Sequence, residues 1–267
     1  MVKRKLVFSV AVTLAVALSL ELLGDPALSV PYKPPKRPPP GRTSSTTVRT
    51  DVQCADQNQA IKEIIPLIPD YLPLPEPGEE QNSKIYSGFN LSEYPILLVY
   101  LPKANAQMGE LVLRDENNRS VTRTRFSLPN QAGIVSLDLA DTNIDPLEPD
   151  KPYWWSVSII CDEVNRSENG ISARVWFQRI TPSATLGQQI FNARPTLLPA
   201  LYAQGDDNGG FWYDALSSLA DLRQLQPNNP TLENQWQELL DSAGLLELTE
   251  QPLLDCCQFQ QQDTPQP

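Results

Sequence analysis

One stretch, Tyr153 to Cys161, constrains the fold more than any other part of the chain, because it alternates between two kinds of side chain. The members of the more apolar set are Tyr153, Trp155, Val157, Ile159 and Cys161, and the residues between them are Trp154, Ser156, Ser158 and Ile160. A period of two with aromatic and β-branched residues predicts a strand that is buried on one face. The chain should therefore contain a sheet with one face in a core.

Further short apolar runs surround this strand. The other strand candidates are the segments 96–101, 111–113, 121–126, 134–139 and 173–180. The polar segment Asp115-Glu116-Asn117-Asn118 separates two of them and predicts a hairpin turn. Several short strands with turn signals between them predict an antiparallel β-sandwich-like domain over residues 51–182. A small helix or turn at residues 60–65 is expected to precede it.

The chain changes character over residues 183–257, where apolar residues recur at helical spacing. One helix is expected around Trp212 to Leu222. A second has Asn229 as its cap, Pro230 in its first turn and Gly244 after its end. Its apolar stripe consists of Leu232, Trp236, Leu239, Leu240 and Ala243. This helical hairpin cannot bury both stripes alone, so we expect it to pack on the β domain in an α+β fold. The Gln-rich tail, 258–267, is expected to be disordered.

The N-terminal segment 1–29 has the three parts of an export signal. Basic residues at positions 3–5 precede an apolar run over 6–20, and Ala27-Leu28-Ser29 offers small residues for cleavage. The alternative is an uncleaved membrane anchor, for which the apolar run is short. Cleavage predicts a periplasmic or extracellular protein without a stable membrane span.

Residues 30–50 are predicted to form a linker that is rich in proline and basic residues. Such a composition favours extended polyproline II structure. The segment could tether the protein to an anionic envelope polymer. Because charge runs are usually solvated, a spacer is the favoured interpretation.

Composition excludes several classes of function. The net charge of −11 argues against a nucleic-acid partner. The absence of histidine removes Ser-His-Asp and Cys-His nucleophile systems and imidazole-dependent zinc sites. The acidic loop Asp206 to Gly210 lacks EF-hand spacing, with Ser217 where the bidentate glutamate should fall. No catalytic, cofactor-binding or metal-binding residue is therefore predicted, and no cofactor.

The four cysteines carry the main covalent prediction. Cys54 begins the β domain and Cys161 ends its best strand, so we expect a disulfide between them in an oxidising compartment. Cys256 and Cys257 are adjacent. They could bond to each other, bond to another chain or stay reduced.

Trp154 and Trp176 form the candidate binding surface. If both strands keep their alternation, the two indoles project from the less apolar face of the sheet. There they could stack on sugar rings or pack on a partner. The alternative, which the apolar stripes of the helices favour, is that the C-terminal helices cover them.

An ordered set of short motifs resembles a family of secreted cyanobacterial proteins, domain of unknown function family 928. The motif residues are Pro31-Tyr32-x-Pro34-Pro35, Cys54, Pro66-x-x-Pro69, Tyr100-Leu101-Pro102, Leu147-x-x-x-Lys151-x-Tyr153-x-Trp155, Cys161, Arg179, Trp212-x-Asp214, Leu222-Arg223, Trp236-x-x-Leu239-Leu240 and Gly244-Leu245. The family has a glycine-rich linker where residues 44–47 here are Ser-Ser-Thr-Thr. The resemblance implies export and a shared fold, and it supplies no activity.

Two hypotheses follow for function. The first is a non-catalytic module of the cell envelope that binds an envelope polymer or protein, or has a structural role there. The alternative is a carboxylate-dependent envelope polysaccharide hydrolase, because the spacing of two carboxylates depends on folding.

Overall fold

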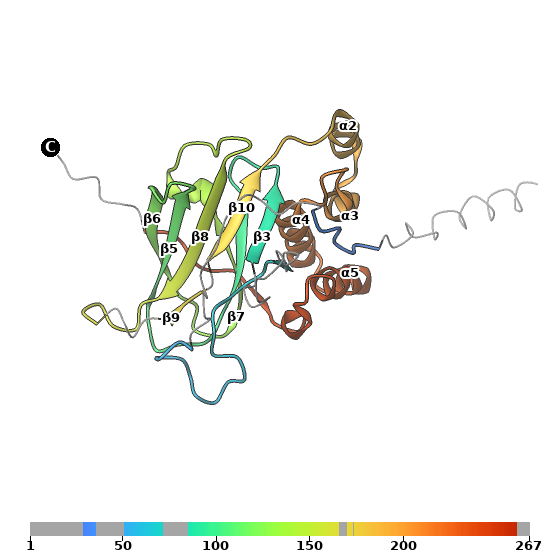
Figure 1. The fold of residues 1–267 in the computed structure, drawn as a ribbon. Coiled ribbons are helices and arrows are strands. Elements are labelled where there is room, and N and C mark those ends of the chain that lie inside the picture. The colour runs from blue at the N-terminus through green and yellow to red at the C-terminus, as the bar shows by residue number, and fades with distance from the viewer. Residues whose placement is uncertain (1–28, 36–50, 72–84, 166–169, 173, 261–267) are drawn as a thin grey trace, which may run out of the picture.

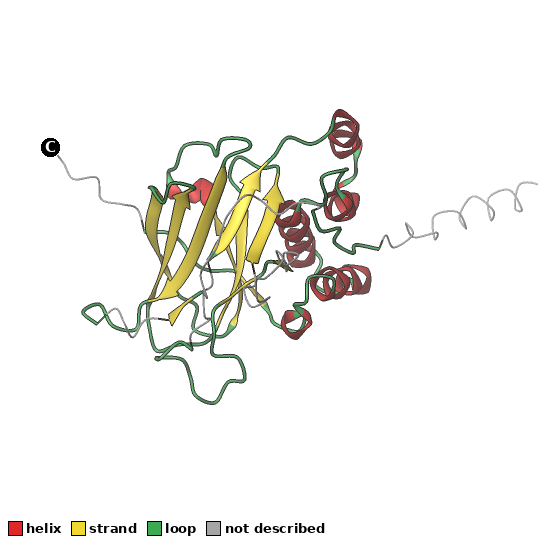
Figure 2. Cartoon of the chain, in the orientation of Figure 1, coloured by secondary structure: helices red, strands yellow, loops and turns green. Residues whose placement is uncertain are grey.

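A computed structural model describes residues 29–35, 51–71, 85–165, 170–172 and 174–260 of the chain. Nearly all of the predicted export signal, most of the predicted linker and the end of the predicted tail lie outside these ranges. Two β-sheets make up one part of the structure, and the α-helices gather on one side of them (Figures 1 and 2). The fold is thus a mixture of two sheets and mainly C-terminal helices.

The smaller sheet has four strands in the order β1-β4-β7-β11. Their bounds are β1 Ile65–Pro66, β4 Ile96–Leu101, β7 Gly133–Asp138 and β11 Leu253–Leu254. β4 has a neighbour on each side and is buried from its second residue onward. A strand that is covered on both faces reads as a continuous apolar run, which is why residues 96–101 lack alternation.

The larger sheet has seven strands, six of them in the order β2-β3-β10-β8-β5-β6, with β9 also paired to β8. Their bounds are β2 Asp70–Tyr71, β3 Ile85–Asn90, β5 Met108–Asp115, β6 Ser120–Ser127, β8 Pro152–Ile159, β9 Gly170–Ile171 and β10 Val175–Arg179. β8 lies between β10 and β5 (Figure 1). The alternating stretch thus occupies the middle of the sheet.

The β5–β6 hairpin forms where the polar turn predicts it. The carboxylate of Asp115 accepts the backbone N–H groups of Asn117 at 2.9 Å and Arg119 at 2.8 Å. Asn118 adopts a positive φ of 64°, a conformation that asparagine tolerates better than most residues. Local side-chain chemistry therefore determines this turn.

One expectation about the β region is met only in part, and another is wrong. Of the helix or turn expected at residues 60–65, no helix forms, because Asp51 pairs with Glu63 and β1 begins at Ile65, whereas a turn and bend occupy residues 57–60. The sheets are not antiparallel throughout, since β10 runs parallel to β3 and β11 runs parallel to β7. Both parallel pairs join strands that are far apart in the chain, and local periodicity carries no information about such pairings.

The inner face of β8 enters the main core. Tyr153, Trp155, Val157 and Ile159 are all buried, and the core that they share contains residues of both sheets and of the helices. The indole N–H of Trp155 donates a hydrogen bond to the hydroxyl of Tyr213 at 3.0 Å. This contact links the central strand to the helical region.

The described ranges also contain four α-helices and three short 3-10 helices. The α-helices are α2 Ala184–Asn192, α3 Leu198–Gln204, α4 Trp212–Leu225 and α5 Pro230–Asp241, and the 3-10 helices are η1 Leu139–Thr142, η3 Pro195–Leu197 and η4 Leu246–Leu248. α4 contacts β3 of the larger sheet, β4 of the smaller sheet and α5. The side chain of Asn229 caps α5 by accepting the N–H of Thr231 at 3.0 Å. Gly244 supplies a positive φ of 73° just after the helix.

The first residues of the predicted linker are not a solvated spacer. Val30 and Tyr32 are buried. The segment 29–35 passes between α3 and α5 (Figure 1). Val30 and Tyr32 have large apolar side chains, whereas prolines and basic residues dominate the rest of the predicted linker. This explains why the start of the linker is buried, since prolines and basic residues alone could not fill a site between helices.

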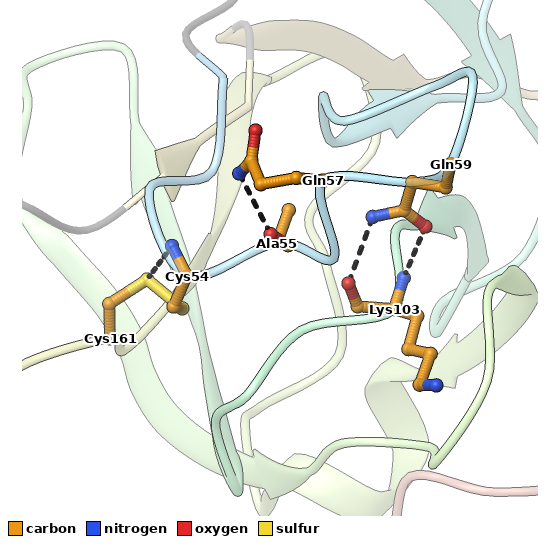
Figure 3. The surroundings of a disulfide bond; sticks show 6 residues. All are labelled: Cys54, Ala55, Gln57, Gln59, Lys103 and Cys161. Carbon is orange, nitrogen blue, oxygen red and sulfur yellow. Dashed lines mark hydrogen bonds between the residues drawn. A yellow bond between two sulfur atoms is a disulfide. The ribbon is translucent and has the colours of Figure 1, made fainter.

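The disulfide between Cys54 and Cys161 is present, as predicted, with the two Cα atoms 5.6 Å apart (Figure 3). It joins the segment before the first strand to the end of β8. Gln59 holds the same segment by pairing its side-chain amide with the backbone of Lys103 at 2.9 Å (Figure 3). Of the three possibilities for Cys256 and Cys257, the structure has them bonded to each other.

Candidate functional site

The outer face of the larger sheet carries a separate aromatic cluster. Trp154 on β8 lies directly across from Trp176 on β10, and the two form a cluster with Val112 on β5. The alternation of β8 explains this position, because Trp154 points away from the core that Tyr153 and Trp155 enter. We call these three residues and the two arginines beside them, Arg114 and Arg174, the Trp–Arg cluster.

Two guanidinium groups lie over the ring of Trp154. The guanidinium carbon of Arg174 is 4.1 Å from the ring centroid, and that of Arg114 is 5.8 Å away. Arg174 is exposed, whereas Arg114 is half-buried and donates a hydrogen bond to the backbone carbonyl of Asn118 at 2.6 Å. A guanidinium that lies over an indole can still donate its N–H groups to a planar anion.

The Trp–Arg cluster has positive charge that the described part of the protein does not neutralise. Neither Arg114 nor Arg174 forms an ion pair with any described acidic residue, whereas Arg123 and Arg125 on the neighbouring strand pair with Glu110 and Glu163. The whole chain carries a net charge of −11. Two arginines over one ring, both without an acidic partner among the described residues, distinguish this face electrostatically on such a protein.

Two polar atoms beside the cluster are buried without a hydrogen-bond partner in the described part of the chain. They are the indole nitrogen of Trp176 and the hydroxyl of Ser87. Their residues are register neighbours on β10 and β3. Buried donors that lack a partner are uncommon in folded proteins. These two groups can therefore still form hydrogen bonds at this edge of the cluster.

The structure changes what the sequence suggests about the two tryptophans. Trp154 is 7% exposed and Trp176 is 8% exposed, so neither is an open stacking platform. The C-terminal helices do not cover them, since no described helical residue belongs to their cluster. Arg174 shares the outer face with Trp176 by simple alternation and could be found from sequence. Arg114 could not, because only the β5–β8 register places it opposite Trp154.

Hollows also occur elsewhere on the described surface. One, of about 620 Å³, lies between the end of α4, the start of α5 and residues 249–255, and its walls include Arg223 and Glu233. These two side chains form an ion pair, and the guanidinium of Arg223 lies 4.7 Å from the ring centroid of Trp236. Two further hollows, of about 590 and 560 Å³, adjoin residues 178–181 and 253–256.

Asp214 is the buried carboxyl that a hydrolase hypothesis would single out. Burial raises its pKa to about 7, and hydrogen bonds from the backbone N–H groups of Leu91, Asp214 itself and Ser92 oppose that rise. A raised pKa is typical of a general acid. Asp214 lines none of the three hollows, however, and its carboxylate accepts the Leu91 N–H at 2.8 Å. Its role here is to join the start of α4 to the turn after β3.

Replacing Asp214 with asparagine should change how stability depends on pH. The wild-type carboxyl has a higher pKa in the folded chain than its usual 3.8, so its stabilising contribution is full below about pH 4 and is lost as the pH rises through 7. Asparagine can accept the same backbone N–H groups and does not ionise. We therefore expect wild type to lose stability relative to Asp214→Asn between pH 4 and 7, measured by urea unfolding. The exposed Asp207→Asn is the control, and parallel pH profiles for all three proteins would contradict the assignment.

The acidic loop 206–210 has structural partners. The carboxylate of Asp206 accepts the backbone N–H groups of Ser183 at 3.0 Å and Asn208 at 2.8 Å, and its carbonyl accepts the ammonium of Lys33 at 2.7 Å. Within the described residues, no cluster of three or more cysteine, aspartate or glutamate side chains could hold a metal ion. None of the helices in the described ranges is both long and apolar enough to cross a membrane, and the apolar run 6–20 lies outside those ranges.

Comparison with known proteins gives one family. No curated protein and no solved structure matches the chain. The family pattern described as Domain of Unknown Function (DUF928) matches residues 44–253, which is well over half of the chain. The chain therefore belongs to that family, as the ordered motifs suggest.

Proposed function

We propose that this protein is an exported, non-catalytic module of the cell envelope, and that the Trp–Arg cluster binds an anionic envelope polysaccharide. The observation that carries the proposal is the pair of arginines on Trp154 without acidic partners among the described residues. Arginine N–H groups pair bidentately with carboxylate and sulfate groups. The two sheets would act as a sandwich-like scaffold for this face, with α4 and α5 as a helical hairpin on another side.

Electrostatics supports the choice of an anionic ligand. A protein of net charge −11 is repelled by an anionic polymer unless a local cationic site orients its approach. The basic residues of the linker, at positions 33, 36, 37, 42 and 49, would add to the attraction. Such binding should weaken as the ionic strength rises, because salt screens exposed charges.

Replacing Arg174 with alanine should weaken binding of polygalacturonate, a polymer of uronic acids, by about tenfold or more, since hydrogen bonds to charged groups contribute about 1.5–3 kcal/mol. The measurement is affinity electrophoresis or calorimetry, with neutral dextran as the second polymer. Arg194→Ala is the matched control, because Arg194 is an exposed arginine in the helical region. Equal losses for both variants, or equal binding of dextran, would refute recognition by the Trp–Arg cluster.

The alternative, a carboxylate-dependent polysaccharide hydrolase, gives a different result in the same system. The mature protein is incubated with intact envelope and recovered. Polymer retained on the protein supports binding, whereas release of soluble fragments supports hydrolysis. An Asp214→Asn variant that still released fragments would show that the buried carboxyl takes no part.

A further inference from the structure

Glu238 on α5 contacts the chain at the bond between Ser29 and Val30. The backbone N–H of Val30 donates a hydrogen bond to Oε2 of Glu238 at 2.8 Å, and the hydroxyl of Ser29 donates to Oε1. The side chain of Val30 is 0% exposed. Both oxygens of one carboxylate are thus directed at the first two described residues of the chain.

The residues after Val30 pack against the helical region and form hydrogen bonds with it. The backbone of Tyr32 donates to the hydroxyl of Ser242 at 3.0 Å, and the Tyr32 ring packs edge-on against Trp212 with centroids 5.0 Å apart. The backbone N–H of Lys33 donates to the carbonyl of Ala203 at 3.0 Å, and its own carbonyl accepts the N–H of Gly210 at 2.8 Å. Residues 30–33 are therefore attached to the region of α3, α4 and α5 through backbone hydrogen bonds and aromatic packing.

The sequence at this point suits a leader peptidase. Ala27 and Ser29 place small residues at the third and first positions before the Ser29–Val30 bond, after an apolar run. Hydrolysis there adds one water across the amide bond. Ser29 leaves with the new carboxylate, and Val30 keeps the nitrogen, which becomes a protonated α-amino group.

We infer that the mature chain begins at Val30 and that Glu238 holds the new α-ammonium group as an ion pair. This inference rests on the proposed export. An ammonium group has three N–H donors. One can donate to Oε2 of Glu238, as the Val30 amide does, and another can donate to Oε1 in place of the Ser29 hydroxyl. Among the described residues, no lysine or arginine is ion-paired with Glu238, so the carboxylate is available for this charge. Charge-assisted hydrogen bonds are roughly twice as strong as neutral ones, so cleavage should tighten the docking of residues 30–35.

The first experiment determines the N-terminus of protein exported by its native host, using mass spectrometry of the intact chain. A chain starting at Val30 is expected. An intact Met1 in the membrane fraction would overturn both export with cleavage and this inference. A chain that starts at another residue would leave export standing and overturn the inference alone.

The second experiment measures how fast an activated ester acylates the α-amino group of the native mature protein. We expect acylation to be slow in wild type and about tenfold faster in Glu238→Gln, because the variant loses the charged partner. Asp241→Asn makes the same charge change at an exposed site on the same helix and should leave the rate unchanged. Equal rates in wild type and Glu238→Gln would refute capture by Glu238.

A third measurement does not depend on reactivity or on a variant that folds poorly. A wild-type chain that starts at Ser29 with an acetylated α-amino group has a neutral amide at Val30 and no ammonium group beside Glu238, so it should melt at a lower temperature than the chain that starts at Val30. In the Glu238→Gln variant, the chains that start at Ser29 and at Val30 should have the same melting temperature. Identical melting temperatures for the two wild-type starts would overturn the inference.

Discussion

Replacing Trp236 with alanine should lower the free energy of unfolding by about 3–5 kcal/mol, through lost burial and the cavity left behind. The indole is 0% exposed and lies in the main core with Leu232, Leu239 and Leu240 of the same helix. Its face is also covered by the guanidinium of Arg223. Thermal unfolding should show the midpoint falling by about 6–20 °C, at about 2–4 °C per kcal/mol for a domain of this size.

The matched control for Trp236→Ala is Phe191→Ala, because Phe191 is an aromatic residue on α2 that is 84% exposed. Its removal should change stability by no more than about 0.5 kcal/mol. A midpoint shift below about 2 °C for Trp236→Ala would show that α5 does not depend on this anchor. The result therefore distinguishes a structural helix pair from an arm that binds a partner.

Replacing Cys54 and Cys161 together with serine should cost on the order of 4 kcal/mol of stability, because the bond closes a long loop in the unfolded chain. The two cysteines are 107 residues apart in sequence. Their bond holds the segment before β1 against the end of β8, which is far from it in the chain (Figure 3). Urea unfolding under non-reducing conditions measures the loss, and peptide mapping should recover both cysteines in one linked peptide.

The second disulfide provides the control for the first. Cys256 and Cys257 are adjacent, so their bond closes almost no loop. In the chain-entropy account, replacing both with serine should therefore lower stability much less than removing the Cys54–Cys161 bond. Free thiols at positions 54 and 161 in exported protein, or equal losses for the two double variants, would contradict this account.

Local patterns in the sequence determined much of the secondary structure. The alternation from Tyr153 onward is sufficient to predict β8, although the strand ends at Ile159 rather than at Cys161. The cap at Asn229 and the exit at Gly244 define α5, and the Asp115 turn defines the β5–β6 hairpin. Each of these signals depends on residues within a few positions of one another, which is why sequence alone reveals them.

The family and the disulfide between Cys54 and Cys161 were also accessible from sequence, for a different reason. Ordered motifs and cysteines are chemical identities, which do not depend on knowing how the chain folds. The sequence could not reveal β3, α2 or α3 as elements, because their apolar residues are few or irregular and neighbours in space stabilise them. α3, for example, is a seven-residue helix that packs on α4.

Only the tertiary structure decided which distant residues meet. The antiparallel pairing of β8 with β10 and the β5–β8 register bring Arg174 and Arg114 to Trp154. The packing of α4 buries Asp214 and raises its pKa, and the path of residues 29–35 brings Val30 to Glu238, 208 positions away. Periodicity, capping and composition describe a residue and its close neighbours in the chain. Long-range contacts depend on how the faces of whole elements fit together, and that fit is a property of the folded chain.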